Sequence, residues 1–131
     1  MEGFILSAHR YLRFVILGFG ILGVLRALAS LNTREAKFMR VDNVLARLYN
    51  GALDVQVLVG VGMVLLYASQ AKPLQWLHPL IMLPAVVVSH LGRRFRTRPD
   101  RDRHKAQLAI YVGSLALVAV GLAVIGELRL M

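Results

Sequence analysis

The chain has 131 residues, 57% of them hydrophobic, and carries 16 Lys and Arg against 7 Asp and Glu, a net charge of +9. Cysteine is absent, which excludes disulfides, thiolate metal sites and thiol catalysis. Because the basic residues stand between long apolar blocks, the charge indicates orientation in a membrane and argues against a nucleic-acid partner.

Four apolar segments of membrane-spanning length follow one another, at about 4–31, 46–69, 74–93 and 106–128. A helix needs ~20 residues to cross the hydrocarbon core, and these runs lack the period of two that a membrane strand would show. The sequence therefore predicts an all-α integral membrane four-helix bundle, one transmembrane domain over residues 1–131. The first segment lacks the charged leader and cleavage site of a secretory signal, and we expect it to be retained.

The first segment places His9 about one turn into the membrane, in the stretch HRYLRF. Gly20 and Ala27 share the His9 face of an ideal helix, and Gly23 lies nearby. Small residues at this spacing usually indicate close helix packing, and they would also leave room for a flat cofactor.

The connection over residues 32–45 has room for a short interfacial helix, and the second segment then carries Asp54 inside an apolar stretch. Ionisable groups inside a membrane are costly and normally have partners. We expect Arg26, near the same end of the first segment, to pair with Asp54. The alternative is that Asp54 carries protons towards a quinone or a cofactor.

The third segment follows the short connection QAKP, which predicts that the second and third helices are antiparallel neighbours. Pro84 lies mid-segment and predicts a kink. His78 stands near its beginning and His90 near its end, ~18 Å apart along an ideal helix and ~120° apart around its axis. The two histidines therefore belong to different depths and do not share a face of a straight helix.

The fourth segment follows the basic connection 94–105, which contains His104 within RDRHK. One end of the bundle holds 12 of the 16 basic residues, namely Arg26, Arg34, Lys37, Arg40, Arg47, Arg93, Arg94, Arg96, Arg98, Arg101, Arg103 and Lys105. Basic loops stay in the cytoplasm, so both termini should lie outside and the connections 32–45 and 94–105 inside. The basic connection should contact anionic lipid headgroups.

The histidines thus sort into an outer pair, His9 and His78, and an inner pair, His90 and His104. Paired histidines from facing helices at one depth can act as axial ligands of a haem iron. Arg13 at the outer level, and Arg93 or Arg94 at the inner level, are placed to pair with haem propionates. The simpler alternatives are hydrogen bonds to headgroups or backbone and, for His104, a solvated loop.

With these residues in view, the chain resembles the small bacterial four-helix membrane proteins that look like b-type cytochromes. The matching stretches are HRYLRF in the first helix, DVQVLVG in the second, HPLIM and HLG in the third, and HK at the start of the fourth. Relatives often have His where this chain has Asp54, so an inner haem would need His90 in its place.

The resemblance implies haem b. We expect one haem at His9 and His78, and a second haem at His90 and His104 is a further alternative. We expect an electron-transfer protein of the bacterial inner (cytoplasmic) membrane that links the quinone pool to a partner. Whether it is an electron carrier or a quinone-reacting cytochrome subunit stays open. The alternative is a cofactor-free membrane anchor or assembly subunit, bound to other membrane subunits or to a second copy of itself. A small transporter that uses Arg26 and Asp54 is a third possibility, but the inverted repeats typical of transporters are absent from the sequence.

Overall fold

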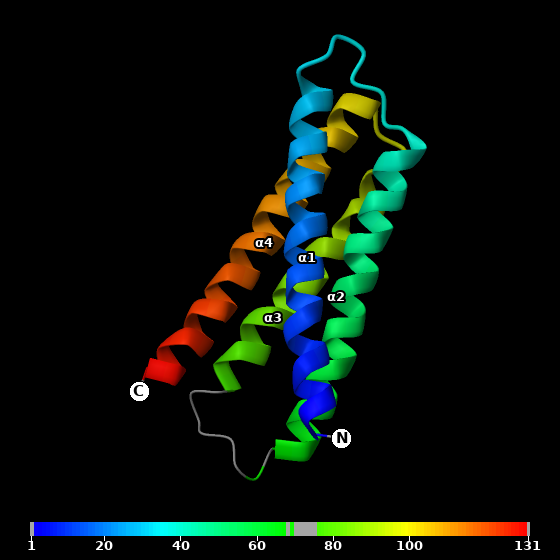
Figure 1. Ribbon diagram of the computed structural model, residues 1–131. Coiled ribbons are helices and arrows are strands. Elements are labelled where there is room, and N and C mark those ends of the chain that lie inside the picture. Colours follow the sequence, from blue (N-terminus) through cyan, green and yellow to red (C-terminus); the bar gives the residue numbers. More distant parts are fainter. Residues whose placement is uncertain (1, 68, 70–75, 131) are drawn as a thin grey trace.

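The computed structural model describes residues 2–67, 69 and 76–130. These residues form four α-helices and one 3₁₀ helix: α1 Glu2–Leu31, α2 Arg40–Tyr67, α3 Leu77–Ser89, η3 His90–Phe95 and α4 Asp100–Leu130. The helices run alternately up and down (Figure 1). One end of the bundle, here called the loop end, carries residues 32–39, η3 and the start of α4. The other end, here called the terminal end, holds the start of α1 and the end of α4.

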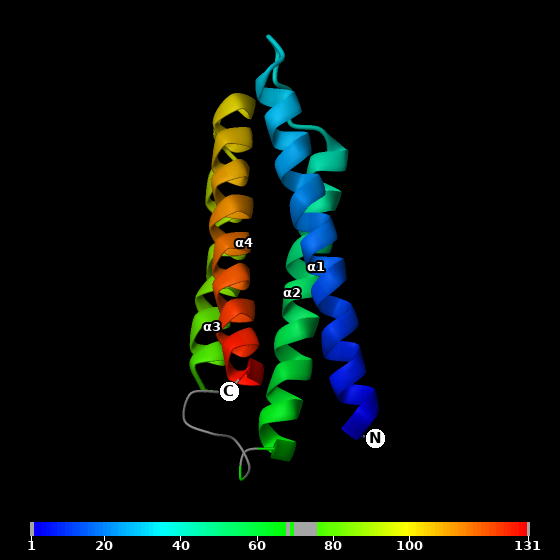
Figure 2. The ribbon, with the colours of Figure 1, turned by 60° about the vertical axis from the view of Figure 1, so that its left-hand side comes forward.

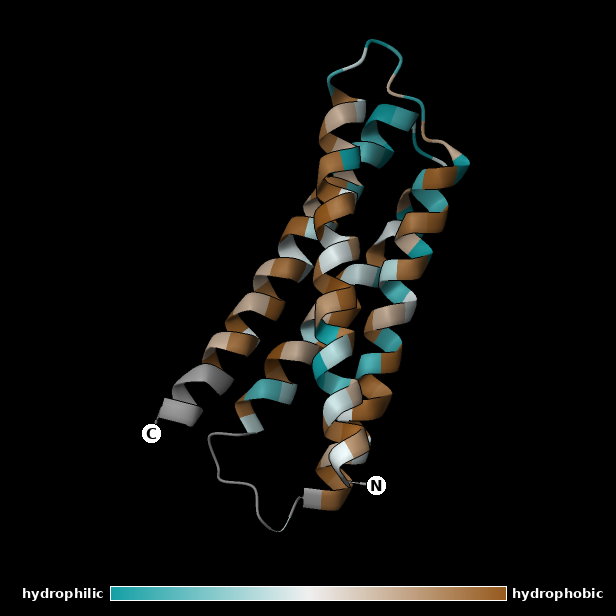
Figure 3. Ribbon diagram, in the orientation of Figure 1, coloured by the Kyte–Doolittle hydropathy of each residue, from teal (hydrophilic) through white to brown (hydrophobic). Residues whose placement is uncertain are grey.

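The predicted all-α bundle is confirmed, and three of its helices are long and apolar enough to cross a membrane, over Gly3–Leu31, Arg40–Leu66 and Asp100–Val124. Figure 3 shows hydrophobic residues along the shafts and hydrophilic residues gathered at the loop end. Large apolar side chains such as Leu58 and Leu65 point outward. This distribution suits shafts surrounded by hydrocarbon and a loop end surrounded by a polar medium.

The third segment differs from the expected single span over 74–93. Its α-helix α3 has 13 residues, and the chain continues as the six-residue 3₁₀ helix η3. Pro84 lies inside α3 and does not end it. The change from α-helix to 3₁₀ helix follows Ser89, whose hydroxyl donates to the Val86 carbonyl at 2.7 Å. Beyond this point η3 packs on α4. At Gly92 a Cβ would stand 2.9 Å from Gln107 Oε1, so the backbone approaches α4 closely there.

No separate interfacial helix forms in the described connection between α1 and α2, where the sequence left room for one. Residues 40–45 belong to α2, which begins six residues earlier than the apolar pattern indicated. The reason is a local cap: Asp42 Oδ2 accepts a hydrogen bond from the Met39 backbone N–H at 2.8 Å. An acidic side chain that reaches back in this way satisfies a free N–H at the helix start.

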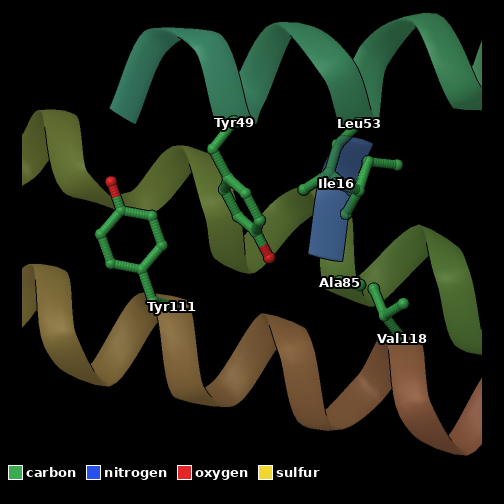
Figure 4. Packing of buried hydrophobic residues seen from close by; sticks show 6 residues of the cluster. All are labelled: Ile16, Tyr49, Leu53, Ala85, Tyr111 and Val118. Carbon is green, nitrogen blue, oxygen red and sulfur yellow. The ribbon is translucent and has the colours of Figure 1, made fainter. Parts of the chain in front are cut away.

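The buried core lies where all four helices meet, and its members are Ile16, Tyr49, Leu53, Ala85, Tyr111 and Val118 (Figure 4). The Tyr49 hydroxyl is 2.6 Å from Ser114 Oγ, which itself donates to the Ile110 carbonyl at 2.7 Å. The two tyrosine rings meet edge to face at 5.2 Å. Polar atoms in this core are therefore satisfied within the bundle itself.

At two glycines of α1, side chains of α4 pack directly against the α1 backbone. A Cβ at Gly20 would stand 2.6 Å from Leu115, and one at Gly23 would collide with the Tyr111 ring. The small residues on the His9 face therefore serve close helix packing at these two positions, the first of the two readings that the sequence allowed.

The four shafts do not pack on one another equally. α3 lies chiefly against α4, and α1 lies against both α2 and α4. α2 and α3 run antiparallel, as predicted, but pack on each other least of these neighbours (Figures 1 and 2). Because α1 and α3 stand diagonally opposite, a contact between them must cross the middle of the bundle. The connection QAKP lies outside the described residues.

Candidate functional site

His9 of α1 and His78 of α3 meet in the bundle near its terminal end. Their ring centres are 6.2 Å apart, and the ring planes are inclined at 78°. These residues come from helices that stand diagonally opposite, so the two imidazoles approach across the interior. The sequence placed them at one depth, and the structure brings them together.

A main-chain hydrogen bond orients His78. Its Nδ1 lies 3.1 Å from the Gly121 carbonyl oxygen of α4, an atom that can only accept, so Nδ1 carries the proton and donates. The other ring nitrogen, Nε2, is then left with a lone pair. Histidines that bind metals commonly donate their second ring nitrogen to a backbone carbonyl in this way, which fixes the tautomer and the ring direction.

The ring of His9 has fewer hydrogen-bond partners than that of His78. Its Nδ1 is buried and finds no hydrogen-bond partner among the described residues. Gln56 of α2 donates from Nε2 to the His9 main-chain oxygen at 2.8 Å, while its own Oε1 is buried and likewise unpaired within the described part of the chain. Buried polar atoms normally find partners, so these two unpaired atoms make this level of the bundle a candidate site.

Glycines stand beside both imidazoles. A Cβ at Gly60 of α2 would lie 3.8 Å from His9 Cε1. A Cβ at Gly121 of α4 would lie 3.4 Å from His78 Nδ1 and 2.8 Å from Met82 Sδ. Gly121 thus lets α3 approach α4 closely enough for its carbonyl to hold His78. Sequence reasoning missed Gly121, because a main-chain acceptor leaves no mark in residue type.

The arginines expected near haem propionates occupy different surroundings. Arg13 is half-buried, one helical turn from His9, with its guanidinium 5.1 Å from the Phe14 ring centre. Arg93 and Arg94 lie exposed on η3. Arg13 therefore stands near the outer histidine pair, whereas Arg93 and Arg94 belong to the surface of the loop end.

His104 is buried and does not lie in a solvated loop, as the alternative interpretation had it. Its side chain is 1% exposed, and its Nε2 lies 2.9 Å from the Lys37 carbonyl oxygen. The ring packs on Phe38 at 4.9 Å. Asp42 Oδ2 is 4.0 Å from the same nitrogen. His104 therefore ties the start of α4 to the connection between α1 and α2.

The expected pair of Arg26 with Asp54 is replaced by two other pairs. Arg26 Nε lies 2.9 Å from Asp42 Oδ1, and Asp54 Oδ1 lies 2.9 Å from His90 Nε2. The early start of α2 explains the exchange, because it places Asp42 in the first helical turn beside Arg26. Asp54 is then ~18 Å further along α2, where η3 supplies His90 as its neighbour.

The inner histidines are engaged separately. His90 Nε2 faces Asp54, and His104 Nε2 faces the Lys37 carbonyl. The cavity beside Arg26, Asp42 and His104 has a volume of about 10 Å³, enough for a single water and no more. Within the described residues, no three side chains of His, Asp and Glu gather as a metal site would require.

Comparisons with protein-family models, with curated proteins and with solved structures found no match to this chain. The function is therefore inferred from the geometry of the histidines, glycines and carboxylates alone.

Proposed function

We propose that the protein is a membrane b-type cytochrome in which His9 and His78 would hold one haem. The observation that carries this proposal is the 6.2 Å separation of the two ring centres. A metal–imidazole bond is ~2 Å long, so two imidazoles on opposite sides of one metal hold their ring centres roughly 6 Å apart. The observed separation of the ring centres fits two imidazoles that bind one metal.

The surrounding residues fit such a group. The Gly121 carbonyl holds His78 in the tautomer whose Nε2 can bind a metal. His9 contributes a buried nitrogen without a partner in the described structure. Arg13, one turn from His9, offers a positive charge for a propionate. Haem would supply one-electron chemistry, with a potential set by its two imidazole ligands and its burial.

The proposed role is electron transfer between the quinone pool and a partner in the bacterial inner membrane. Support comes from three helices of membrane-spanning character and from the basic residues at the loop end, which favour a cytoplasmic location for that end. The proposal has one haem. His90 and His104 do not support a second, because other groups engage the Nε2 atom of each.

The test is a reduced-minus-oxidised absorption spectrum of the protein purified in detergent after expression with ample haem. We expect a b-type signal that is lost in His9→Ala and in His78→Ala. The matched control is His90→Ala, which removes a histidine outside the pair and should keep the signal. A colourless wild-type protein would refute the proposal, and so would a spectrum that both outer variants leave unchanged.

The second candidate function is a cofactor-free anchor or assembly subunit. It is supported by Gly20 and Gly23, against which the Leu115 and Tyr111 side chains of α4 pack closely, as at helix–helix contacts that need no cofactor. This function predicts a colourless protein that co-purifies in fixed stoichiometry with other membrane subunits. The spectrum distinguishes the two, since only the cytochrome requires haem.

A further inference from the structure

A polar cleft of about 500 Å³ opens at the loop end between α2, η3 and the first turns of α4. This volume falls in the ~300–1,000 Å³ range of ordinary small-molecule sites. Four arginines line it: Arg47, Arg93, Arg96 and Arg103. The cleft is separate from the His9–His78 pair, which lies towards the terminal end.

The charge in the cleft is unbalanced. Asp54 is the one carboxylate among the described lining residues, and it is paired with His90 at 2.9 Å. Arg103 lies over the Phe38 ring at 3.9 Å and 3.3 Å from Asn43 Oδ1. No described carboxylate lies within ion-pair distance of the four arginines. Guanidinium groups bind phosphate through paired, charge-assisted hydrogen bonds, so the cleft suits a phosphate-bearing anion.

Amide side chains also line the cleft, and one of their oxygen atoms lacks a hydrogen-bond partner among the described residues. Asn50 lines it, and its Oδ1 is buried without a partner among the residues described. Gln107 is buried nearby, with its Oε1 close to the backbone of Gly92. Amide groups that stand beside arginines add hydrogen bonds to a polar headgroup and narrow the range of anions that fit.

An apolar strip continues from the cleft into the bundle shaft. Leu58 lies one turn beyond Asp54 on the same face of α2, while Val87 and Leu83 lie on the His90 face of α3. All three side chains are more than half exposed, at 72%, 63% and 52%. Since Asp54 and His90 pair across these elements, helical spacing places the three side chains beside the seam between α2 and α3, the neighbouring shafts that pack on each other least. A ligand with a phosphate and a hydrocarbon chain would match both parts.

We propose that the cleft and the seam together bind one anionic phospholipid. Its phosphate lies among Arg47, Arg93, Arg96 and Arg103, and an acyl chain runs along Leu58, Leu83 and Val87. Basic pockets between membrane helices at the cytoplasmic side are suited to such headgroups. This proposal is independent of haem, because no residue of the outer histidine pair takes part.

The experiment uses the full chain, delipidated in a neutral detergent and examined by native mass spectrometry. Three additions are compared: dioleoyl phosphatidylglycerol, dioleoyl phosphatidylcholine and inorganic phosphate. We expect one phosphatidylglycerol to be retained, about tenfold more strongly than phosphatidylcholine. Dihexanoyl phosphatidylglycerol, with the same headgroup and short chains, should bind more weakly than the dioleoyl lipid if the seam contributes.

The double variant R93Q/R96Q should lower retention about tenfold. The matched control R34Q/R98Q removes two exposed arginines of the same end that do not line the cleft, and it should retain the lipid as the wild type does. Equal retention of both lipids, or equal loss in both double variants, would overturn the proposal in favour of a diffuse basic surface. Phosphate binding without phosphatidylglycerol retention would overturn it in favour of a soluble anion. The wild-type comparison remains decisive if a variant fails to fold, and His9→Ala should still bind the lipid.

Discussion

Each end of the bundle holds two histidines, and His9 at the terminal end differs from the other three. At the loop end His104 donates from Nε2 to the Lys37 carbonyl, and His90 faces Asp54. At the terminal end His9 keeps a buried nitrogen without a described partner, and Gln56 a buried oxygen. The difference teaches that depth alone does not distinguish a structural histidine from a ligand. Under the proposed function, the distinguishing property is whether both ring nitrogens already have partners within the fold.

The largest effect should come from breaking the satisfied loop end. Asp42→Ala removes the acceptor for Arg26 and for the Met39 N–H, and it takes a carboxylate from beside His104. Breaking a buried pair by removing one partner costs ~3–5 kcal/mol, and since Arg26 is partly exposed we expect about 3 kcal/mol. Unfolding in mixed detergent followed by circular dichroism measures it. A loss below that of Asp54→Ala would contradict the assignment.

The second test concerns the packed core next to that end. Gly23→Val places a branched side chain against the Tyr111 ring, where even a Cβ collides. Overpacking of this kind costs ~1–3 kcal/mol, and we expect a value near the upper limit because an aromatic ring in a buried cluster has little room to move. The same unfolding assay applies. Gly18→Val, at a position with nothing within 4 Å of its Cβ, is the control and should cost much less.

A third variant tests the histidine pair without replacing His9 or His78. Gly121→Ala brings a Cβ to 2.8 Å from Met82 Sδ and 3.4 Å from His78 Nδ1, so the Met82 side chain must move and the His78 ring is pressed beside the carbonyl that orients it. If the pair binds haem, disturbing such an outer support should weaken haem binding ~10-fold. Haem titration of the apo-protein measures this change. Gly62→Ala, whose Cβ meets nothing within 4 Å, should titrate as the wild type does.

The smallest effect should come from the exposed pair at the loop end. Asp54→Asn removes a charge from a contact in which the side chains of His90 and Asp54 are 33% and 50% exposed. Pairs of this exposure contribute ~0–1 kcal/mol, so unfolding should change little. A loss near that of Asp42→Ala would show that Asp54 is a structural anchor. If Asp54 instead carries protons, quinone-coupled activity should fall while stability stays.

The sequence predicted the helices well and their starts poorly. Length and hydropathy indicate a spanning helix directly, which is why the shafts were found. The first turns of α2 and α4 are charged, with Asp42 at one and Asp100 and Asp102 at the other, so an apolar window could not include them. Acidic residues at a helix start are stabilised there by the helix dipole, and they extend a helix beyond its apolar part.

Of the candidate site, the sequence predicted only that His9 and His78 lie at the same depth in the bundle. Their ring centres do lie 6.2 Å apart. The Arg26–Asp54 pair failed because it depended on the point where α2 begins, which the Asp42 cap determines. The bond from His78 to the Gly121 carbonyl had no residue-type signal, since every residue offers a carbonyl.

The diagonal position of His9 and His78 has a consequence for how the bundle assembles. A group held by both imidazoles would act as a crosslink through the middle of the molecule, between two shafts that lack an extensive interface of their own. Its binding energy would then become folding energy, because a ligand that binds the native state alone stabilises that state. The abundance of the protein in a cell would in that case follow the supply of the cofactor, with the empty chain removed by proteolysis.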